Sequence, residues 1–193
     1  VHTVTLSNAS SVATTYSLAL ADVTATGGGT DYTSALTNAA FSNGVTIAAG
    51  VITVPAGVTS FTVTVPTTSD TIDEVNETYT LTVGAASGTG TITDDDPAPT
   101  ISSVTAATQL EGTSLVHTVT LSNASSSATT FAYSLGGGTA TGGGTDYTTP
   151  PTFSNGVTLA GAILTVPAGV TSFTVTVPTT LDTIDEGASE NYT

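Results

Sequence analysis

The sequence predicts an all-β chain built as two tandem antiparallel β-sandwiches. Three observations lead to this prediction. Apolar residues alternate with threonine over many short stretches, which is the period-two pattern of strands with one buried face. A long block of sequence occurs twice. No stretch shows the sustained periodicity of roughly 3.6 residues, with caps at its ends, that an amphipathic helix requires.

Short strands are expected wherever the alternation is clear. The clearest case is "FTVTV" at 61–65, where large apolar residues alternate with threonine. The other expected strands are residues 2–6 and their copy at 117–121, 16–20, 51–54, 79–83 and 89–93. Turn sequences such as "GGG" at 27–29 and "PAG" at 55–57 separate them. About seven short strands per copy, each with one polar face, predict seven-stranded sandwiches of immunoglobulin-like architecture.

The chain consists of two copies of one unit. "VHTVTLSNASS" begins at residue 1 and again at residue 116, and "VPAGVTSFTVTVPTT" begins at residue 54 and again at residue 166. The period of about 114 residues suits an independently folded domain and is too long for a solenoid unit. We assign 1–96 to the first copy, without its first strand region, and 97–193 to the second, without its last strands. We therefore expect neighbouring repeats of the same array on either side.

Composition excludes several classes of partner. The 193 residues include 15 Asp and Glu but no Lys or Arg, and the formal net charge is −15. The chain cannot neutralise phosphates by ion pairing, so nucleic acid and anionic membrane surfaces are excluded as partners. No apolar run approaches the roughly 20 residues that cross a bilayer, so direct membrane insertion is not expected. The absence of cysteine rules out disulfides and thiolate metal sites. Cations are the natural partners that remain.

The acidic residues gather at a few recurrent positions. Asp31 and Asp146 each follow a "GGGT" sequence, four acids lie in "DTIDEVNETYT" at 70–80 and four in its near-copy "DTIDEGASENYT" at 182–193, and three form the "DDD" run at 94–96. Glu111 opens the strand region of copy two. Only Asp22 falls outside this pattern. In a sandwich these loops can all meet at one pole. Several carboxylates are therefore expected to converge.

Converging carboxylates in a chain without basic residues call for a cation. Two like charges about 4 Å apart repel by roughly 4 kcal/mol at an effective dielectric constant near 20. Hard divalent ions suit an oxygen-only ligand set, and the flexible coordination of Ca²⁺ suits a site built from loops better than the strict octahedron of Mg²⁺. The alternative is that the acidic loops are simply solvated and keep the protein soluble.

Four motifs in order resemble the Calx-β domain over nearly the whole repeat. They are "EGTSLVHTVTLSN", "GTATGGGTDYT", "AGVITVPAGVTSFTVTVPTTSDTIDEVNETYTLTV" and "GTGTITDDD". The resemblance implies a seven-stranded immunoglobulin-like sandwich that binds Ca²⁺. In calcium-binding members the ligands come from the leading glutamate, the aspartate of "DY", the acidic stretch before the sixth strand and the terminal aspartates.

Carried over by motif, the resemblance implies two sets of Ca²⁺ ligands. In copy one they are Asp31, Asp70, the backbone carbonyl near Ile72, Glu74, Glu77, Asp94, Asp95 and Asp96. In copy two they are Glu111, Asp146, Asp182, the backbone carbonyl near Ile184, Glu186 and Glu190. The family often has paired aspartates where this chain has Ser69-Asp70 and Leu181-Asp182, so one ligand is missing from each copy. The insertion "FSNGVT" has no family role to carry over.

Other motifs favour structural roles. No lysine follows the glycine triplets and no helix is expected behind them, so they are turns and not phosphate-binding loops. His2 and His117 lie at equivalent strand positions on the same face as neighbouring valines, which predicts packing at the end of the sandwich. Acid pairs such as Asp70 and Glu74 imitate the carboxylates of a glycosidase, but no sugar-stacking aromatics are expected beside them. We therefore expect no enzymatic activity.

These expectations combine into a structural function. The sequence predicts an extender, or spacer, repeat of a long bacterial cell-surface adhesin or matrix protein, located outside the cell. Ca²⁺ bound at the domain poles and junctions would make the array rigid. The alternative is an adhesive module that recognises a glycan or protein ligand through its loops.

Overall fold

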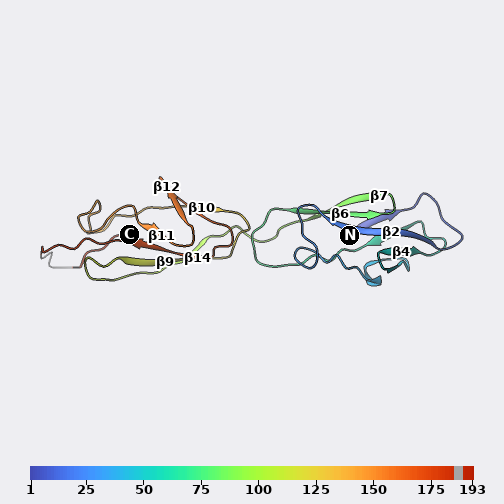
Figure 1. The fold of residues 1–193 in the computed structure, drawn as a ribbon, viewed down its shortest axis with the longest axis horizontal. Helices are drawn as coiled ribbons and strands as arrows, with labels where there is room; N and C mark the ends of the chain where they lie inside the picture. Colours follow the sequence, from blue (N-terminus) through green and yellow to red (C-terminus); the bar gives the residue numbers. More distant parts are fainter. Residues whose placement is uncertain (185–188) are drawn as a thin grey trace. The chain divides into compact units, whose positions relative to one another are not determined.

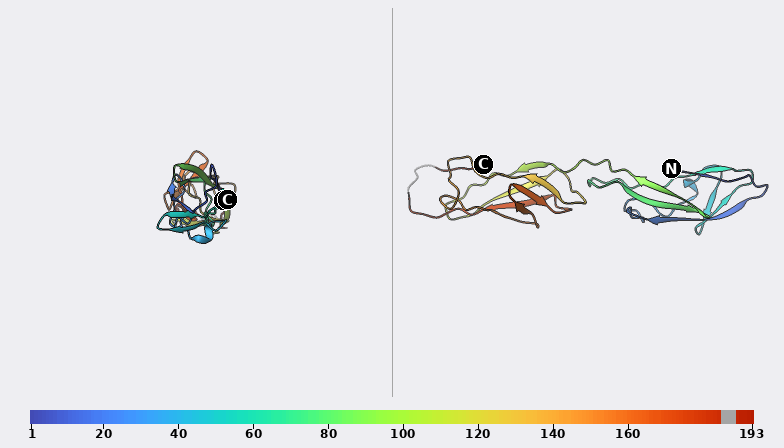
Figure 2. Two further views of the ribbon diagram at one scale, coloured as in Figure 1. Left: turned by 90° about the vertical axis from the view of Figure 1, so that its right-hand side faces the viewer. Right: turned by 90° about the horizontal axis from the view of Figure 1, so that it is seen from above.

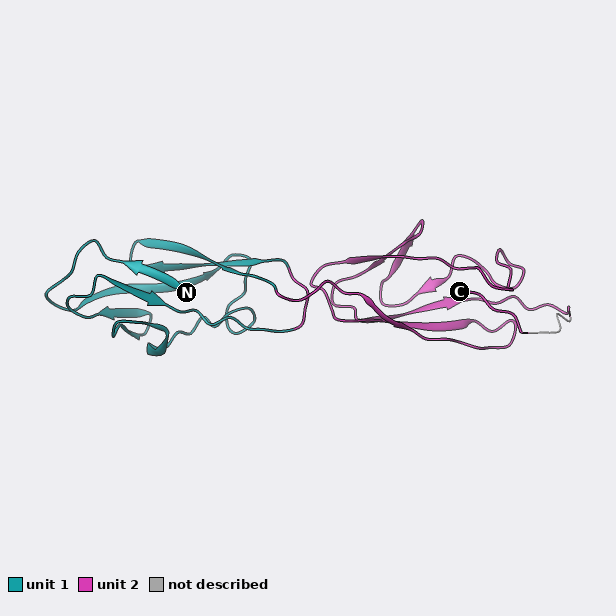
Figure 3. Ribbon diagram, turned by 180° about the vertical axis from the view of Figure 1, so that it is seen from behind, with its two compact units in different colours: residues 1–70, 75–94 teal, residues 71–74, 95–193 magenta. Residues whose placement is uncertain are grey.

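The computed structural model describes residues 1–184 and 189–193, which divide into two compact units (Figure 3). Unit 1 comprises Val1–Asp70 and Val75–Asp94, and unit 2 comprises Thr71–Glu74 and Asp95–Thr193. Each unit contains seven strands, so the prediction of two tandem all-β sandwiches is confirmed. The division falls between Asp94 and Asp95, whereas the sequence places it after Asp96. The short acidic segment 71–74 belongs with unit 2.

Unit 1 is a sandwich of a five-stranded and a two-stranded sheet (Figures 1 and 2). The order in the larger sheet is β3-β4-β2-β6-β7, and β1 pairs with β5 in the smaller one, all antiparallel. Its strands are β1 (His2–Thr5), β2 (Thr14–Asp22), β3 (Thr46–Ala48), β4 (Val51–Val54), β5 (Ser60–Val63), β6 (Glu77–Val83) and β7 (Ala86–Ile92). One 3-10 turn, η1 (Asn38–Ala40), precedes β3.

Unit 2 has the same arrangement for the strands that it shares with unit 1. The order in one sheet is β11-β14-β9-β8 and in the other β10-β13-β12. Its strands are β8 (Ile101–Val104), β9 (Leu115–Leu121), β10 (Thr129–Ala132), β11 (Thr152–Phe153), β12 (Thr158–Ala160), β13 (Ile163–Val166) and β14 (Ser172–Val177). By position in the repeat, β9, β10, β12, β13 and β14 correspond to β1, β2, β3, β4 and β5.

The alternation of apolar residues and threonine decides which face of each strand is buried. In β5, Phe61 and Val63 are at most 1% exposed and Thr62 faces outward. Tyr79, Leu81 and Val83 of β6 alternate with threonines in the same way and meet Phe61 in one core. Burial of each such side chain contributes about 1.5–3 kcal/mol. The predicted period-two strands are therefore confirmed, and the core lies between the two sheets.

The insertion "FSNGVT" extends the smaller sheet and locks its edge. Phe41 bridges to Val63 of β5, and the N–H of Thr62 donates to Ser42 Oγ at 2.7 Å. Asn43, at φ 55°, donates from Nδ2 to the carbonyl oxygen of Ser60, also at 2.7 Å.

Unit 2 makes the same three contacts from Phe153, Ser154 and Asn155. The insertion therefore occupies the outer backbone edge of β5, and of β14 in the second copy, which would otherwise be open to pairing.

Two tyrosines and a histidine pack at one end of the unit 1 core. The ring of Tyr32, which is fully buried, stacks on Tyr79 with 4.7 Å between ring centroids. His2 Nε2 lies 3.0 Å from the hydroxyl of Tyr79.

Unit 2 repeats the pair with His117 Nε2 at 2.9 Å from the hydroxyl of Tyr192. The other ring nitrogen of His117, Nδ1, donates to the carbonyl oxygen of Thr105 at 2.8 Å. These contacts agree with the packing role that the sequence predicts for both histidines.

Gly90 of β7 makes room for this aromatic cluster. It lies opposite Tyr79 in the β6 to β7 pairing, and a Cβ at position 90 would come within 2.2 Å of the Tyr79 ring. Gly88, on the same face of the same strand, would place its Cβ no closer than 3.7 Å to any neighbour.

We expect Gly90→Ala to lower the free energy of unfolding by about 1–3 kcal/mol, because the tyrosine ring must leave its position to admit the methyl group. Gly88→Ala is the matched control and should change stability by well under 1 kcal/mol. Urea unfolding of both variants tests this. Equal effects of the two substitutions would show that the Tyr79 ring does not depend on the missing Cβ.

Candidate metal centre

The loop "TGGGTDY" positions the first carboxylate, Asp31. The N–H of Thr26 donates to Asp31 Oδ2 at 2.6 Å, and the N–H of Asp31 donates to the carbonyl oxygen of Thr26 at 3.0 Å. The loop closes on itself in this way because Gly28 and Gly29 take φ values of +80° and +96°, which side chains rarely tolerate. Tyr32 then enters the core and anchors the loop.

Two glutamates join Asp31. Glu77 is the first residue of β6, and Glu74 lies three residues earlier in the acidic loop. Asp31, Glu74 and Glu77 each offer a carboxylate oxygen within 4.8 Å of the other two, and all three side chains are half-buried. These are three of the residues that the sequence puts forward as ligands, so residues more than forty positions apart are brought together.

The chemistry of this group suits a hard cation. Its donors are carboxylate oxygens only, and the chain has no Lys or Arg to neutralise them. Oxygen ligands at such spacing match Ca²⁺, which accepts mono- and bidentate carboxylates in flexible geometry. Three partly buried negative charges repel, so an ion bound among them would stabilise the folded arrangement.

The remaining ligands predicted for copy one lie outside this group of three. Asp70 and Asp95 are exposed, and Ile72, Asp94 and Asp96 are half-buried. The N–H of Asp94 donates to Asn76 Oδ1 at 3.0 Å, which ties the end of β7 to the acidic loop. Whether these residues complete the coordination of an ion stays a prediction.

Segment 71–74 is held by backbone bonds of Asp73, a residue outside the predicted ligand set. Its N–H donates to the carbonyl oxygen of Ala124 at 3.1 Å, and its carbonyl oxygen accepts from the N–H of Ser126 at 2.9 Å. These two bonds explain why the segment belongs with unit 2.

Copy two builds the same loop but shows no such group among its described residues. Asp146 accepts from the N–H of Thr141 and donates its own N–H to that residue's carbonyl oxygen at 3.0 Å, as Asp31 does. Asp182 accepts at Oδ1 from the N–H of Ile184 at 2.7 Å. Glu111 and Glu190 are exposed, and Glu186 lies outside the described residues.

Asp22, which the sequence sets apart from the acidic pattern, has a defined role at the same pole. Its Oδ1 accepts from the hydroxyl of Tyr32 at 2.5 Å and from the N–H of Gly27 at 2.9 Å. The hydrogen bonds from Tyr32 and Gly27 lower the pKa of Asp22. Burial first, and then the bond to Asp22, raises the pKa of Tyr32 to about 12.

One signal in the sequence could have located Asp22. Asp22 ends a strand eight residues before "TDY". The two copies differ at this position, since the second copy has Gly137 there. Tyr147, the counterpart of Tyr32, therefore has no carboxylate from this position. The two copies differ in how they hold the same tyrosine.

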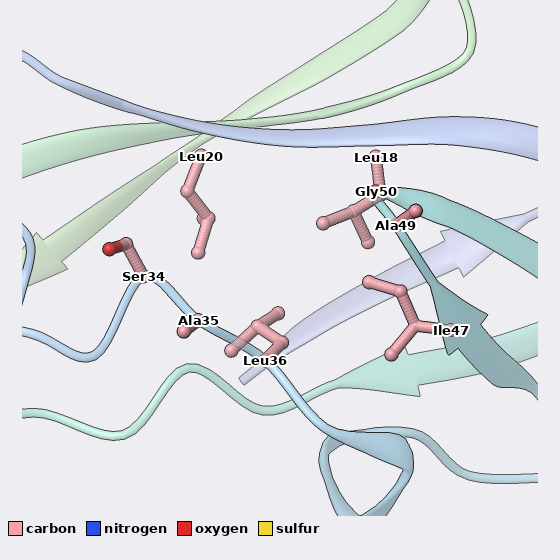
Figure 4. A pocket seen from close by; sticks show the side chains of 8 residues that line it. All are labelled: Leu18, Leu20, Ser34, Ala35, Leu36, Ile47, Ala49 and Gly50. Carbon is pink, nitrogen blue, oxygen red and sulfur yellow. The ribbon is translucent and has the colours of Figure 1, made fainter.

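Unit 1 also contains a small hollow, which is lined mostly by apolar residues (Figure 4). Its volume is about 210 Å³, and the side chains of Leu18, Leu20, Leu36 and Ile47 point into it. Its full lining is Leu18, Leu20, Ser34, Ala35, Leu36, Ile47, Ala49 and Gly50. It contains one hydroxyl and no ionisable group, so it offers little that would orient a polar ligand.

The fold and the acidic loops define a class: antiparallel immunoglobulin-like sandwiches in tandem, with carboxylates at the ends of their strands. The chain belongs to the Calx-beta domain family, since the family model described as "Calx-beta domain" matches residues 2–109 and again residues 93–193. The predicted family and its tandem repetition are thereby confirmed. Domains of this family are associated with calcium in general. No curated protein matches the chain.

A search of the described residues for membrane spans found no helix with the length and apolar character needed to cross a bilayer.

The bond between Tyr32 and Asp22 should make unit 1 lose stability at both ends of the pH scale. The folded pKa of Tyr32, about 12, exceeds its ordinary value near 10, so its contribution is complete below pH 10 and falls as the pH rises toward 12. The folded pKa of Asp22 is lowered, so its contribution is complete above its ordinary value near 4 and falls as the pH drops through the folded pKa.

Urea midpoints measured across this range test the expectation. Tyr32→Phe should flatten both limbs of the profile, whereas Tyr147→Phe, which lacks a carboxylate at the position of Asp22, should leave the acid limb unchanged. An acid limb that survives Tyr32→Phe would assign it to other carboxylates.

Proposed function

We propose that this pair of Calx-beta domains is an extender of a long bacterial cell-surface adhesin or matrix protein, made rigid by Ca²⁺. The observation that carries the proposal is the group formed by Asp31, Glu74 and Glu77 in a chain without a basic side chain. The repeat of one unit with a short Pro-Ala-Pro linker supports a role in spacing, because such a linker has little of the flexibility of a Gly/Ser tether.

Binding of Ca²⁺ would act through linkage. An ion that binds only the folded state stabilises it by about 2.7 kcal/mol when its free concentration is a hundred times the dissociation constant. Extracellular calcium modules have dissociation constants on the order of 10⁻⁴ to 10⁻³ M, so the site would fill outside the cell and stay empty in cytosolic calcium. This is the physical basis for proposing an extracellular location.

The positions of the three carboxylates support a stiffening role for a bound ion. Asp31 belongs to the "TGGGTDY" loop, Glu77 begins β6, and Glu74 lies in the acidic loop that connects β5 to β6. One ion would therefore tie the "TGGGTDY" loop to the acidic loop and to the start of β6. Asp94 is bonded to Asn76 in the same loop, and the "DDD" run that it begins leads directly into the linker.

We expect Ca²⁺ to raise the melting temperature and excess chelator to lower it. Glu77→Gln removes one ligand charge and should abolish most of the increase, whereas Asp73→Asn removes the same charge from the same loop outside the group and should preserve it. Terbium luminescence sensitised by tyrosine gives an independent readout, since the chain contains no tryptophan. Equal melting temperatures with Ca²⁺ and with chelator, together with no terbium signal, would rule the site out.

Rigidity is tested separately by small-angle X-ray scattering. With saturating Ca²⁺ we expect a single well-defined scattering profile, and with chelator a broader distribution of end-to-end distances. Glu77→Gln in Ca²⁺ should resemble the wild type in chelator. Scattering that does not change while Ca²⁺ still raises the melting temperature would reduce the role of the ion to domain stability and contradict its proposed role as a stiffener.

A further inference from the structure

Among the described residues, β7 in unit 1 lies at an open edge of its sheet, and the strand is neither short nor charged nor bulged. β7 runs for seven residues and, among the described residues, pairs only with β6 (Figure 1). Its sequence, "ASGTGTI", contains no charge and no proline, and its pairing with β6 shows no register shift. Natural edge strands are usually short, charged, bulged or covered.

Two other edges of unit 1 illustrate the contrast. β3, at the far edge of the same sheet, has only three residues and ends at a tight turn with Ala49 and Gly50 at positive φ. In the smaller sheet, the segment "FSNGVT" covers the outer edge of β5. β7 is therefore an edge left available for pairing.

We propose that β7 pairs with β7 of a second copy of this chain, antiparallel and centred on Thr89. The strand is suited to this because it is nearly symmetric about Thr89, with Gly88 facing Gly90 and Ser87 facing Thr91 of the partner. A two-fold pairing presents the same patch from both copies, so a symmetric sequence satisfies both halves at once. The outward positions would form a row of hydroxyl and methyl groups across the new pair.

The acidic residues favour this orientation. Asp22 and Glu77 lie level with the carboxyl end of β7, because Asp22 pairs with Tyr79 and Glu77 with Ile92, and Asp94 follows that end. The turn Gly84-Ala85 at the other end of β7 has no acidic residue beside it in sequence, and the N–H of Gly84 bonds to Ser17.

An antiparallel pair centred on Thr89 therefore keeps the two acidic poles apart. Five residues separate Thr89 from Asp94, so the two Asp94 residues would be roughly 34 Å apart along the strands at about 3.4 Å per residue. That distance is several times the Debye length of about 8 Å at physiological ionic strength. A parallel pair would instead place the acidic poles side by side, where they repel.

Single cysteines test the contact, because the chain has none of its own. Under mild oxidation we expect the full chain with Thr89→Cys to form a disulfide-linked dimer. Thr80→Cys, the neighbour of Thr89 on β6 and on the same face, is the matched control and should stay monomeric. An equal mixture of Ser87→Cys and Thr91→Cys chains should give more heterodimer than homodimer.

Sedimentation equilibrium supplies the second readout. The wild type should sediment as a dimer, Thr89→Asp as a monomer because two carboxylates would face each other, and Thr80→Asp as a dimer. The proposal is overturned if the wild type stays monomeric at its highest soluble concentration, or if the position 80 cysteine crosslinks as fast as the one at 89. It is also overturned if homodimers prevail in the mixture, which would indicate parallel pairing. Crosslinking of Thr89→Cys should be the same with Ca²⁺ and with excess chelator, so this result does not depend on the proposed Ca²⁺ site.

Discussion

The structure depends on one constraint: fifteen carboxylates must fold without a lysine or arginine to balance them. The strands meet it by carrying neutral side chains, chiefly threonine outside and valine or phenylalanine inside. The carboxylates are left to the loops and strand ends, where water or a cation can reach them. Because the sheets carry almost no charge, the acidic residues are concentrated in a few loops, among them those that form the candidate metal centre.

Hydrogen bonds from polar side chains stabilise the loops and edges of this chain, which has no Lys or Arg to form ion pairs. Ser42 and Asn43 bind the backbone of β5, Asp31 binds the loop that precedes it, and Asp22 holds the buried hydroxyl of Tyr32. Each of these bonds satisfies a backbone or buried group that would otherwise be costly to leave unpaired. A short polar side chain next to a glycine turn is the recurring solution in both copies.

Comparison of the two copies separates the frame of the domain from its variable parts. The insertion "FSNGVT" and the loop around Asp31 recur as the same bonds around Asn155 and Asp146. Position 22 does not recur, since Gly137 replaces Asp22. The hollow is lined partly by Leu18, and the second copy has Tyr133 at that position, packed edge-on against Phe153. The two copies therefore share the bonds of the insertion and of the Asp31 loop, and they differ at position 22 and in the lining of the hollow.

The sequence by itself determined the family, the all-β class, the duplication and most of the strands, because period-two alternation and the repeated motifs are local properties. It also named Asp31, Glu74 and Glu77 as candidate ligands. Only the tertiary structure decided that these three converge and that Asp22 binds Tyr32. Tertiary structure likewise revealed that "FSNGVT" closes a sheet edge, while β7 stays open. Those outcomes depend on which strands become neighbours, and pairing between residues far apart in the chain leaves no local pattern to read.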